Sequence, residues 1–154
     1  MIIDKVITSS QEQTQKLGDR LARKLRPGSF VALSGPLGSG KTTLIKGICK
    51  GLGVKELVRS PCFVIMTQYP GKLRVYHFDL FRLKNAEELF SVGYEEYFYG
   101  DGICLVEWAD KAKKLLPRER VDVFLRIVSE SEREIRIKRV KPQKEKDRCG
   151  DKNS

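Results

Sequence analysis

The sequence predicts one α/β domain with a mostly parallel central sheet, helices on both faces and a C-terminal antiparallel hairpin. Three observations support this fold class. The chain has 154 residues, which is the size of a single domain. Short apolar runs at residues 30–33 and 103–106 alternate with helical patterns, as buried parallel strands do. Residues 121–128 and 134–140 alternate with period two around a polar turn, which predicts a hairpin at one edge of the sheet.

The N-terminal half is expected to alternate strands with helices. Residues 2–7 alternate weakly and predict a short strand. A helix capped by Ser9 or Ser10 should run to about residue 25, where Pro27-Gly28 ends it. The apolar strand at residues 30–33 follows, and then a second helix over residues 41–50. This order is the strand–helix alternation of a parallel sheet.

The C-terminal half is expected to begin with two strands, at residues 62–67 and 73–78, around the turn Pro70-Gly71. Short helices are expected at residues 85–90 and 109–115, on either side of the strand at 103–106. The final hairpin then completes a domain of residues 1–140.

Residues 141–154 have a different composition from the rest of the chain. They contain five basic and three acidic side chains and no aliphatic residue. Such a segment cannot bury enough apolar surface to offset the entropy of ordering. We expect a basic, disordered tail, with a basic arm that touches nucleic acid as the alternative.

Composition excludes several classes of protein. Hydrophobic residues make up 40% and charged residues 32%, which is a globular balance and not that of a disordered chain. The net charge of +10 favours anionic partners without naming one. No apolar run approaches the roughly 20 residues that a membrane span needs, and the first residues lack the pattern of a secretory signal. We expect a cytoplasmic protein with no membrane association.

The cysteine pattern does not indicate a zinc site or a disulfide framework. Cys49, Cys62, Cys104 and Cys149 form no C-x-x-C pair, and His77 is the only histidine. In a chain without a secretory signal, we expect mostly buried thiols in a reducing compartment.

Residues 35–42, GPLGSGKT, fit the phosphate-loop pattern G-x-x-x-x-G-K-[ST] between a predicted strand and a predicted helix. Glycines let backbone N–H groups converge on phosphate oxygens, and the helix N-terminus adds its dipole. Lys41 would neutralise phosphate charge, Thr42 would bind Mg²⁺ through its hydroxyl, and Thr43 would lie near the α-phosphate. The sequence therefore predicts a P-loop NTPase domain. The predicted nucleotide-binding residues of this segment are Gly35, Gly38, Ser39, Gly40, Lys41, Thr42 and Thr43.

Two predicted strands end in an acid, which a P-loop site needs for Mg²⁺ and for orienting the attacking water. Glu107 follows the strand at residues 103–106, and Asp79 follows Val75-Tyr76-His77-Phe78. Trp108, the only tryptophan, is either a core residue or a contact of the nucleotide beside Glu107. His77 is expected to be a partly buried, hydrogen-bonded residue, with catalysis as the alternative.

Two further features bear on the nucleotide. The N-K-x-D signature of guanine recognition is absent, which favours ATP. Arg82 and Arg133 are either solvated charges or contacts of phosphate.

The ordered set of motifs across residues 8–140 resembles the small bacterial P-loop ATPases of tRNA threonylcarbamoyladenosine synthesis, the TsaE family. The loop alone is shared by many families, whereas its combination with the later motifs is far more specific. Two positions depart from the family pattern: Cys62 stands in place of a threonine and Phe81 in place of a tyrosine. The matching residues are Ser10, Thr14, Leu17-Gly18, 35–43, Ser60-Pro61, 76–80 (YHFDL), Arg82-Leu83, Glu87-Glu88-Leu89, Gly93 and Val106-Glu107-Trp108.

The resemblance implies a Mg²⁺-dependent ATPase, slow without partners, that binds a heterodimer of TsaD and TsaB and resets it between rounds of tRNA modification. It implies that Lys41, Asp79 and Glu107 are catalytic and that Thr42 and Glu107 hold the metal. It also implies that Gln11 and Arg133 lie near the nucleotide. It implies that the protein comes near tRNA only indirectly, through its partners.

Two other functions remain open at the level of sequence. One is a small-molecule P-loop kinase, and the other is a nucleotide-dependent interaction protein with little turnover. Aromatic residues that follow the candidate acids either form a protein interface or cover the core; they are Tyr94, Tyr97, Phe98 and Tyr99.

Overall fold

The computed structural model describes residues 2–59 and 65–142. Expectations for Ser60, Pro61 and Cys62 and for residues 143–154 lie outside the described residues. The strands are β1 (Ile2–Thr8), β2 (Phe30–Ser34), β3 (Met66–Tyr69), β4 (Val75–Asp79), β5 (Ile103–Glu107), β6 (Arg120–Ile127) and β7 (Arg133–Val140). The helices are α1 (Gln11–Ala22), α2 (Lys41–Gly51), α3 (Glu87–Ser91), α4 (Tyr94–Phe98) and the 3-10 helix η1 (Ala109–Leu115).

The seven strands form one sheet in the order β1-β7-β6-β2-β5-β4-β3. The four central strands, β6, β2, β5 and β4, are parallel to their neighbours. The pairs β1–β7, β6–β7 and β3–β4 are antiparallel. The expected parallel central strands and antiparallel hairpin are therefore present, whereas the sheet as a whole is mixed. Short turns join β3 to β4 and β6 to β7, and strands joined by a short turn pair antiparallel.

The C-terminal hairpin also lies elsewhere than expected. Its first strand, β6, pairs parallel with β2 inside the sheet, and β1 occupies the edge beside β7. The N-terminal strand β1 is thus the edge strand on the side of the sheet that contains the hairpin.

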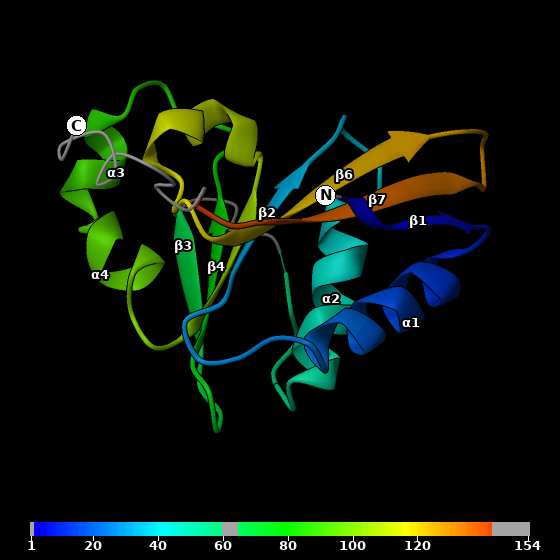
Figure 1. Ribbon diagram of the computed structural model, residues 1–154, viewed down its shortest axis with the longest axis horizontal. Helices are drawn as coiled ribbons and strands as arrows, with labels where there is room; N and C mark the ends of the chain where they lie inside the picture. The colour runs from blue at the N-terminus through cyan, green and yellow to red at the C-terminus, as the bar shows by residue number, and fades with distance from the viewer. Residues whose placement is uncertain (1, 60–64, 143–154) are drawn as a thin grey trace, which may run out of the picture.

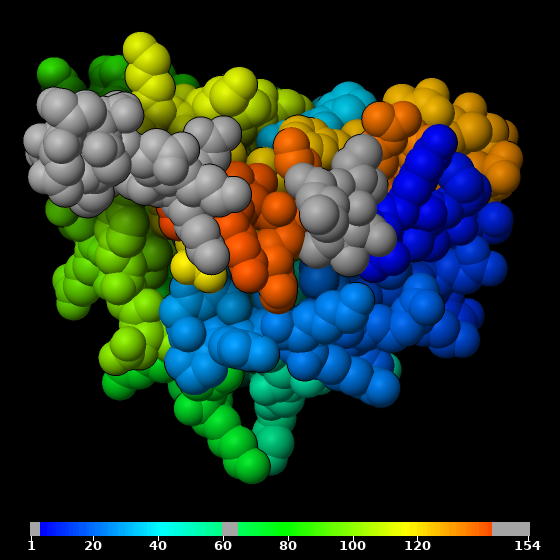
Figure 2. Space-filling model, viewed as in Figure 1, coloured from blue at the N-terminus to red at the C-terminus, as the bar shows by residue number. Residues whose placement is uncertain are grey.

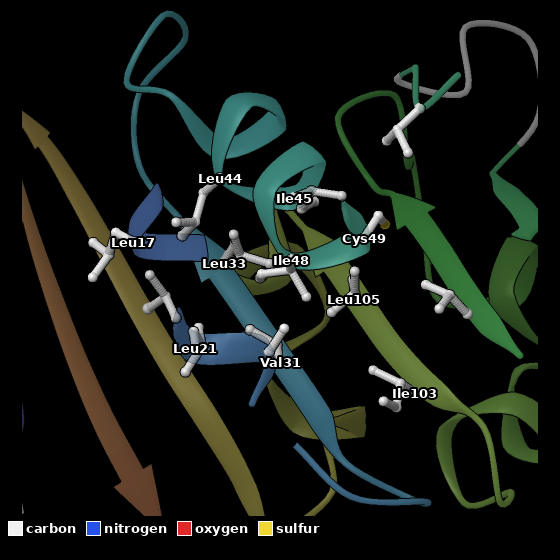
Figure 3. Close-up of a cluster of buried hydrophobic side chains, with 14 of the residues drawn as sticks. Leu17, Leu21, Val31, Leu33, Leu44, Ile45, Ile48, Cys49, Ile103 and Leu105 are labelled. Atoms are coloured by element: carbon white, nitrogen blue, oxygen red, sulfur yellow. The ribbon is translucent and has the colours of Figure 1, made fainter. Parts of the chain in front are cut away.

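Helices cover both faces of the sheet (Figure 1). Val31 and Leu33 of β2 point toward α1 and α2, where they join a large apolar cluster (Figure 3). Phe30 and Ala32 point the other way, into a second cluster with α3, α4 and η1. Both faces of β2 are buried, which explains why this strand is apolar at consecutive positions instead of alternating.

Helices α1 and α2 approach closely because glycines line their contact. A Cβ on Gly47 would lie 2.1 Å from the carbonyl oxygen of Gln15. A Cβ on Gly18 would lie 2.4 Å from the carbonyl oxygen of Leu44. Both distances are far inside van der Waals contact, so the backbones themselves form the interface. The start of α1 is fixed by Ser10, whose side chain accepts a hydrogen bond from the Gln13 N–H.

The aromatic residues of α4 mainly cover the core. Tyr94 and Phe98 are buried, and the ring of Phe98 packs edge-on against Phe30 and Phe78. Tyr99, which follows the helix, is 63% exposed. The sequence did not predict α4, because five residues after Gly93 are too few to display helical periodicity.

Two of the four cysteines lie in the described residues, and both are buried free thiols, as expected. Burial raises the pKa of the Cys49 thiol to about 12. In the described part of the chain, no helix combines the length and the apolar character needed to span a membrane.

We predict that Gly47→Ala destabilises the protein by about 1–3 kcal/mol, because its methyl group would push α1 away from α2. Helix propensity alone would give the opposite sign, since alanine favours a helix by about 1 kcal/mol over glycine. Urea denaturation measures the difference. The control is Lys46→Ala at the neighbouring exposed position of α2, which should stay within about 0.5 kcal/mol of the original protein. A Gly47→Ala variant as stable as this control would contradict the close packing.

Candidate functional site

The loop of residues 35–42 connects the carboxyl end of β2 to the first turn of α2. Gly40 has φ of 100°, a left-handed conformation that glycine adopts without strain. A Cβ on Gly35 would lie 2.6 Å from the carbonyl oxygen of Leu125 in β6. The loop therefore rests against the C-terminal hairpin, and glycine is required there for the close approach.

Lys41 is the buried cation of the loop, with 5% of its surface exposed. Its ammonium donates hydrogen bonds to the carbonyl oxygens of Gly35 at 2.6 Å and Pro36 at 2.9 Å. Burial lowers the pKa of Lys41, and the charges of Glu107, Asp79 and Asp110 act in the opposite direction. An ammonium that donates to loop carbonyl oxygens at the start of a helix is suited to an anionic ligand such as phosphate.

Glu107 ends β5 as a carboxylate that is only 2% exposed. The Thr42 hydroxyl donates to its Oε1 at 2.7 Å, and His77 Nε2 lies 2.7 Å from its Oε2. Because a carboxylate only accepts hydrogen bonds, we assign the proton to His77 Nε2. His77 is hydrogen-bonded, as expected, but it is fully buried where partial burial was expected. Its Nδ1 has no hydrogen-bond partner among the described residues.

Asp79 lies level with Glu107, because β4 and β5 pair in parallel with these two residues in register. Its Oδ1 accepts a hydrogen bond from the Phe81 N–H at 3.0 Å. Burial raises the pKa of Asp79, and the charge of Glu107 raises it further. The hydrogen bond from the Phe81 N–H opposes this shift most, and His77 and Lys41 oppose it less. The two predicted acids thus stand side by side next to the loop lysine.

Trp108, which directly follows Glu107, lies against Lys41 of the loop. It is the only non-glycine residue with positive φ (58°) in the described part of the chain. Its ring lies 4.0 Å from the Lys41 ammonium and 5.0 Å from the Phe81 ring, centroid to centroid. Phe81, one of the two departures from the family pattern, therefore supplies the ring that packs on Trp108.

Gln11 and Arg133 lie on the other side of the loop. Both line a cleft of about 260 Å³ together with Thr43. Arg133 Nε donates to the Gly38 carbonyl oxygen at 3.2 Å, which ties β7 to the loop. The other lining residues of this cleft are Ser9, Ser10, Thr14, Gly38, Gly40, Glu130 and Ser131.

The structure brings together all the predicted site residues in two groups around one loop. Arg82, considered in the sequence as a phosphate contact, is exposed and has no hydrogen bond or ion pair to a described residue. Two residues near the loop were not predicted from the sequence: Asp110, whose charge acts on Lys41, and Leu125, whose carbonyl oxygen lies against Gly35. No local pattern could have found Leu125, because it belongs to a strand 90 positions further along the chain.

The side-chain oxygens of Thr42 and Glu107 are suited to a hard divalent cation. Mg²⁺ is usually bound by one or two protein oxygens, with waters and substrate phosphates completing the shell. The Thr42 hydroxyl and the Glu107 carboxylate form such a pair. The described residues contain no cluster of three or more His, Cys, Asp or Glu that could form an all-protein metal site.

The fold and the site define a single-domain α/β protein with a mixed seven-stranded sheet, whose candidate site lies at the carboxyl ends of the parallel strands. A family model described as threonylcarbamoyl adenosine biosynthesis protein TsaE matches residues 8–135. The chain belongs to the TsaE family. This confirms the resemblance inferred from the sequence.

Individual relatives agree with this assignment. A protein named tRNA threonylcarbamoyladenosine biosynthesis protein TsaE from Treponema pallidum is 37% identical over 131 residues, 85% of this chain and 97% of the relative. A protein of the same name from Bacillus subtilis is 40% identical over 129 residues, covering 83% and 80%. The crystal structure of YdiB from Bacillus subtilis is similar, with a TM-score of 0.76 and 36% identity over 91% of this chain and 88% of that chain.

We predict that His77→Leu destabilises the protein by about 1–3 kcal/mol, because it removes a donor from a buried carboxylate. His77→Gln should lose less, since a side-chain amide can donate to the same oxygen. Chemical denaturation of the two variants measures the difference. A leucine variant as stable as the original protein would show that the His77–Glu107 contact does not support the fold.

Proposed function

We propose that the protein is a Mg²⁺-dependent ATPase of tRNA threonylcarbamoyladenosine biosynthesis. The observation that carries this proposal is the Thr42–Glu107 hydrogen bond of 2.7 Å beside the Lys41 loop. It joins a loop suited to phosphate with a hydroxyl and a carboxylate suited to Mg²⁺. The names of the relatives support the pathway.

Each residue of the chain has a separate task in this proposal. The ammonium of Lys41 would exchange its bonds to the Gly35 and Pro36 carbonyls for phosphate oxygens and neutralise their charge. Thr42 and Glu107 would hold Mg²⁺, which when bound stabilises the charge that develops on the phosphates. His77 would keep the Glu107 carboxylate in place.

We propose that the Asp79 carboxylate accepts a proton from the attacking water. Its pKa is raised by burial and by the neighbouring Glu107, which brings the carboxylate closer to the proton affinity that a general base needs. Its position level with Glu107 places it beside the proposed metal ligand.

Gln11, Thr43 and Arg133 are the proposed contacts on the far side of the nucleotide, because they line the cleft next to the loop. Trp108 is proposed to face the nucleotide from the opposite side, beside Lys41. A small-molecule kinase would use the same phosphate site but would transfer phosphate to an acceptor instead of to water, so the products distinguish the two functions.

We predict that Lys41→Ala lowers ATP affinity by about 10- to 100-fold, because the buried ammonium is lost from the phosphate site. Glu107→Gln should bind ATP within about threefold of the original protein but hydrolyse it at least about tenfold more slowly. Titration calorimetry and phosphate release measure the two quantities, and Lys46→Ala in α2 is the control. Native turnover in a folded Lys41→Ala variant would refute the site. Native turnover in Glu107→Gln would transfer the metal role to Asp79.

We predict further that hydrolysis by the isolated protein is slow and increases when a TsaB–TsaD pair is added. The pair should bind more tightly in one nucleotide state, since only a differential affinity can couple hydrolysis to release. Pull-down and turnover with ATP, with ADP and without nucleotide test this coupling. Equal affinity in all three conditions, with unchanged turnover, would remove the partner role. Phosphate transfer to a small acceptor would instead favour the kinase.

A further inference from the structure

A second cleft, of about 310 Å³, lies at the amino ends of the parallel strands, at the end of the sheet opposite to the loop. It is formed where β2 and β6 begin, whereas the loop follows the end of β2. Residues of the α1–β2 connection and the end of β7 meet around it, on the face of the molecule in Figure 2. The lining residues are Lys24, Arg26, Pro27, Gly28, Ser29, Phe30, Glu119, Arg120, Val121, Arg139 and Lys141.

Basic side chains dominate this cleft, with five Lys and Arg against the single acid Glu119. Two of the five cations have carboxylate partners. Arg120 binds Asp122 at 2.7 Å and the Pro117 carbonyl oxygen at 2.9 Å, and Lys24 lies 3.8 Å from Asp4. These two cations contribute to local structure and leave little charge for a ligand.

The other three cations have no such neutralisation. Arg26, Arg139 and Lys141 are exposed, and none forms an ion pair with a carboxylate of the described residues. They come from two separate parts of the chain, the connection after α1 and the end of β7, and they meet only in the folded protein. Three uncompensated cations around one polar cleft attract an anion with several negative oxygens.

We propose that this cleft binds phosphate groups of an RNA strand. Two guanidinium groups and an ammonium match phosphate oxygens, because the planar guanidinium donates two parallel hydrogen bonds to them. The choice of RNA as the source of the phosphate rests on the proposed role in tRNA modification. The presence of the cleft and its positive charge are independent of that role.

The position of the cleft separates it from the candidate ATP site. The cleft lies where β2 and β6 begin, and the Lys41 loop lies beyond the other ends of these strands. RNA binding therefore does not require the loop, and the two sites can be occupied together. This separation also makes failure of the two proposals distinguishable, since ATP hydrolysis and RNA binding are measured independently.

The test is fluorescence anisotropy of a labelled tRNA transcript with the full chain over a range of salt concentrations. The double variant Arg26→Ala/Arg139→Ala should bind at least about tenfold more weakly, and the salt slope should fall by about two. Lys46→Ala/Lys50→Ala, which removes the same charge from exposed positions of α2, is the matched control and should show a much smaller loss. ATP hydrolysis should be unchanged in both double variants.

Competition identifies the source of the phosphate. Unlabelled RNA should displace the probe, whereas inorganic pyrophosphate and poly-glutamate at equal charge should not. Equal weakening in the cleft variant and the control would overturn the site. Displacement by pyrophosphate as effective as by RNA would overturn RNA as the ligand in favour of a small phosphate compound. Equally effective displacement by poly-glutamate would overturn phosphate recognition in favour of an acidic protein surface.

Discussion

The structure depends on the burial of one carboxylate, that of Glu107. A carboxylate removed from water must receive hydrogen bonds, or its desolvation would cost several kcal/mol. Thr42 and His77 each meet one of its oxygens at 2.7 Å. These two residues lie in α2 and β4, so the pair of contacts joins a helix and two strands at one point. The sheet order β2-β5-β4 is what brings them within reach.

Contacts from several elements hold the loop beside this carboxylate. Glycine contacts fix α2 against α1, and α2 begins at Lys41. Gly35 lies against β6, and Arg133 of β7 binds the Gly38 carbonyl oxygen. The loop is therefore held from the helix and from the C-terminal hairpin at once. A site supported in this way keeps its donors in position without the ligand having to order them.

Charge is distributed differently at the carboxyl ends and the amino ends of the parallel strands. At the carboxyl ends of the parallel strands, Asp79 and Glu107 surround the cationic Lys41, and the pKa shifts of Asp79 and Lys41 follow from burial in this confined region. At the amino ends, the cations of the second cleft largely lack carboxylate partners. The first arrangement is suited to a metal and a nucleotide, and the second to a polyanion.

Sequence alone determined the local features: the loop at residues 35–42, the apolar strands that end in Asp79 and Glu107, a helix cap at Ser9 or Ser10 and the final hairpin. Each of these is encoded within a few consecutive residues, through periodicity, glycine placement or side-chain chemistry. Only the tertiary structure decided that β6 lies inside the sheet, parallel to β2, and that β1 lies at its edge, antiparallel to β7. It also decided that His77 meets Glu107 and that Leu125 supports Gly35. Such contacts join distant parts of the chain, and their choice depends on how whole strands pack, which no short segment specifies.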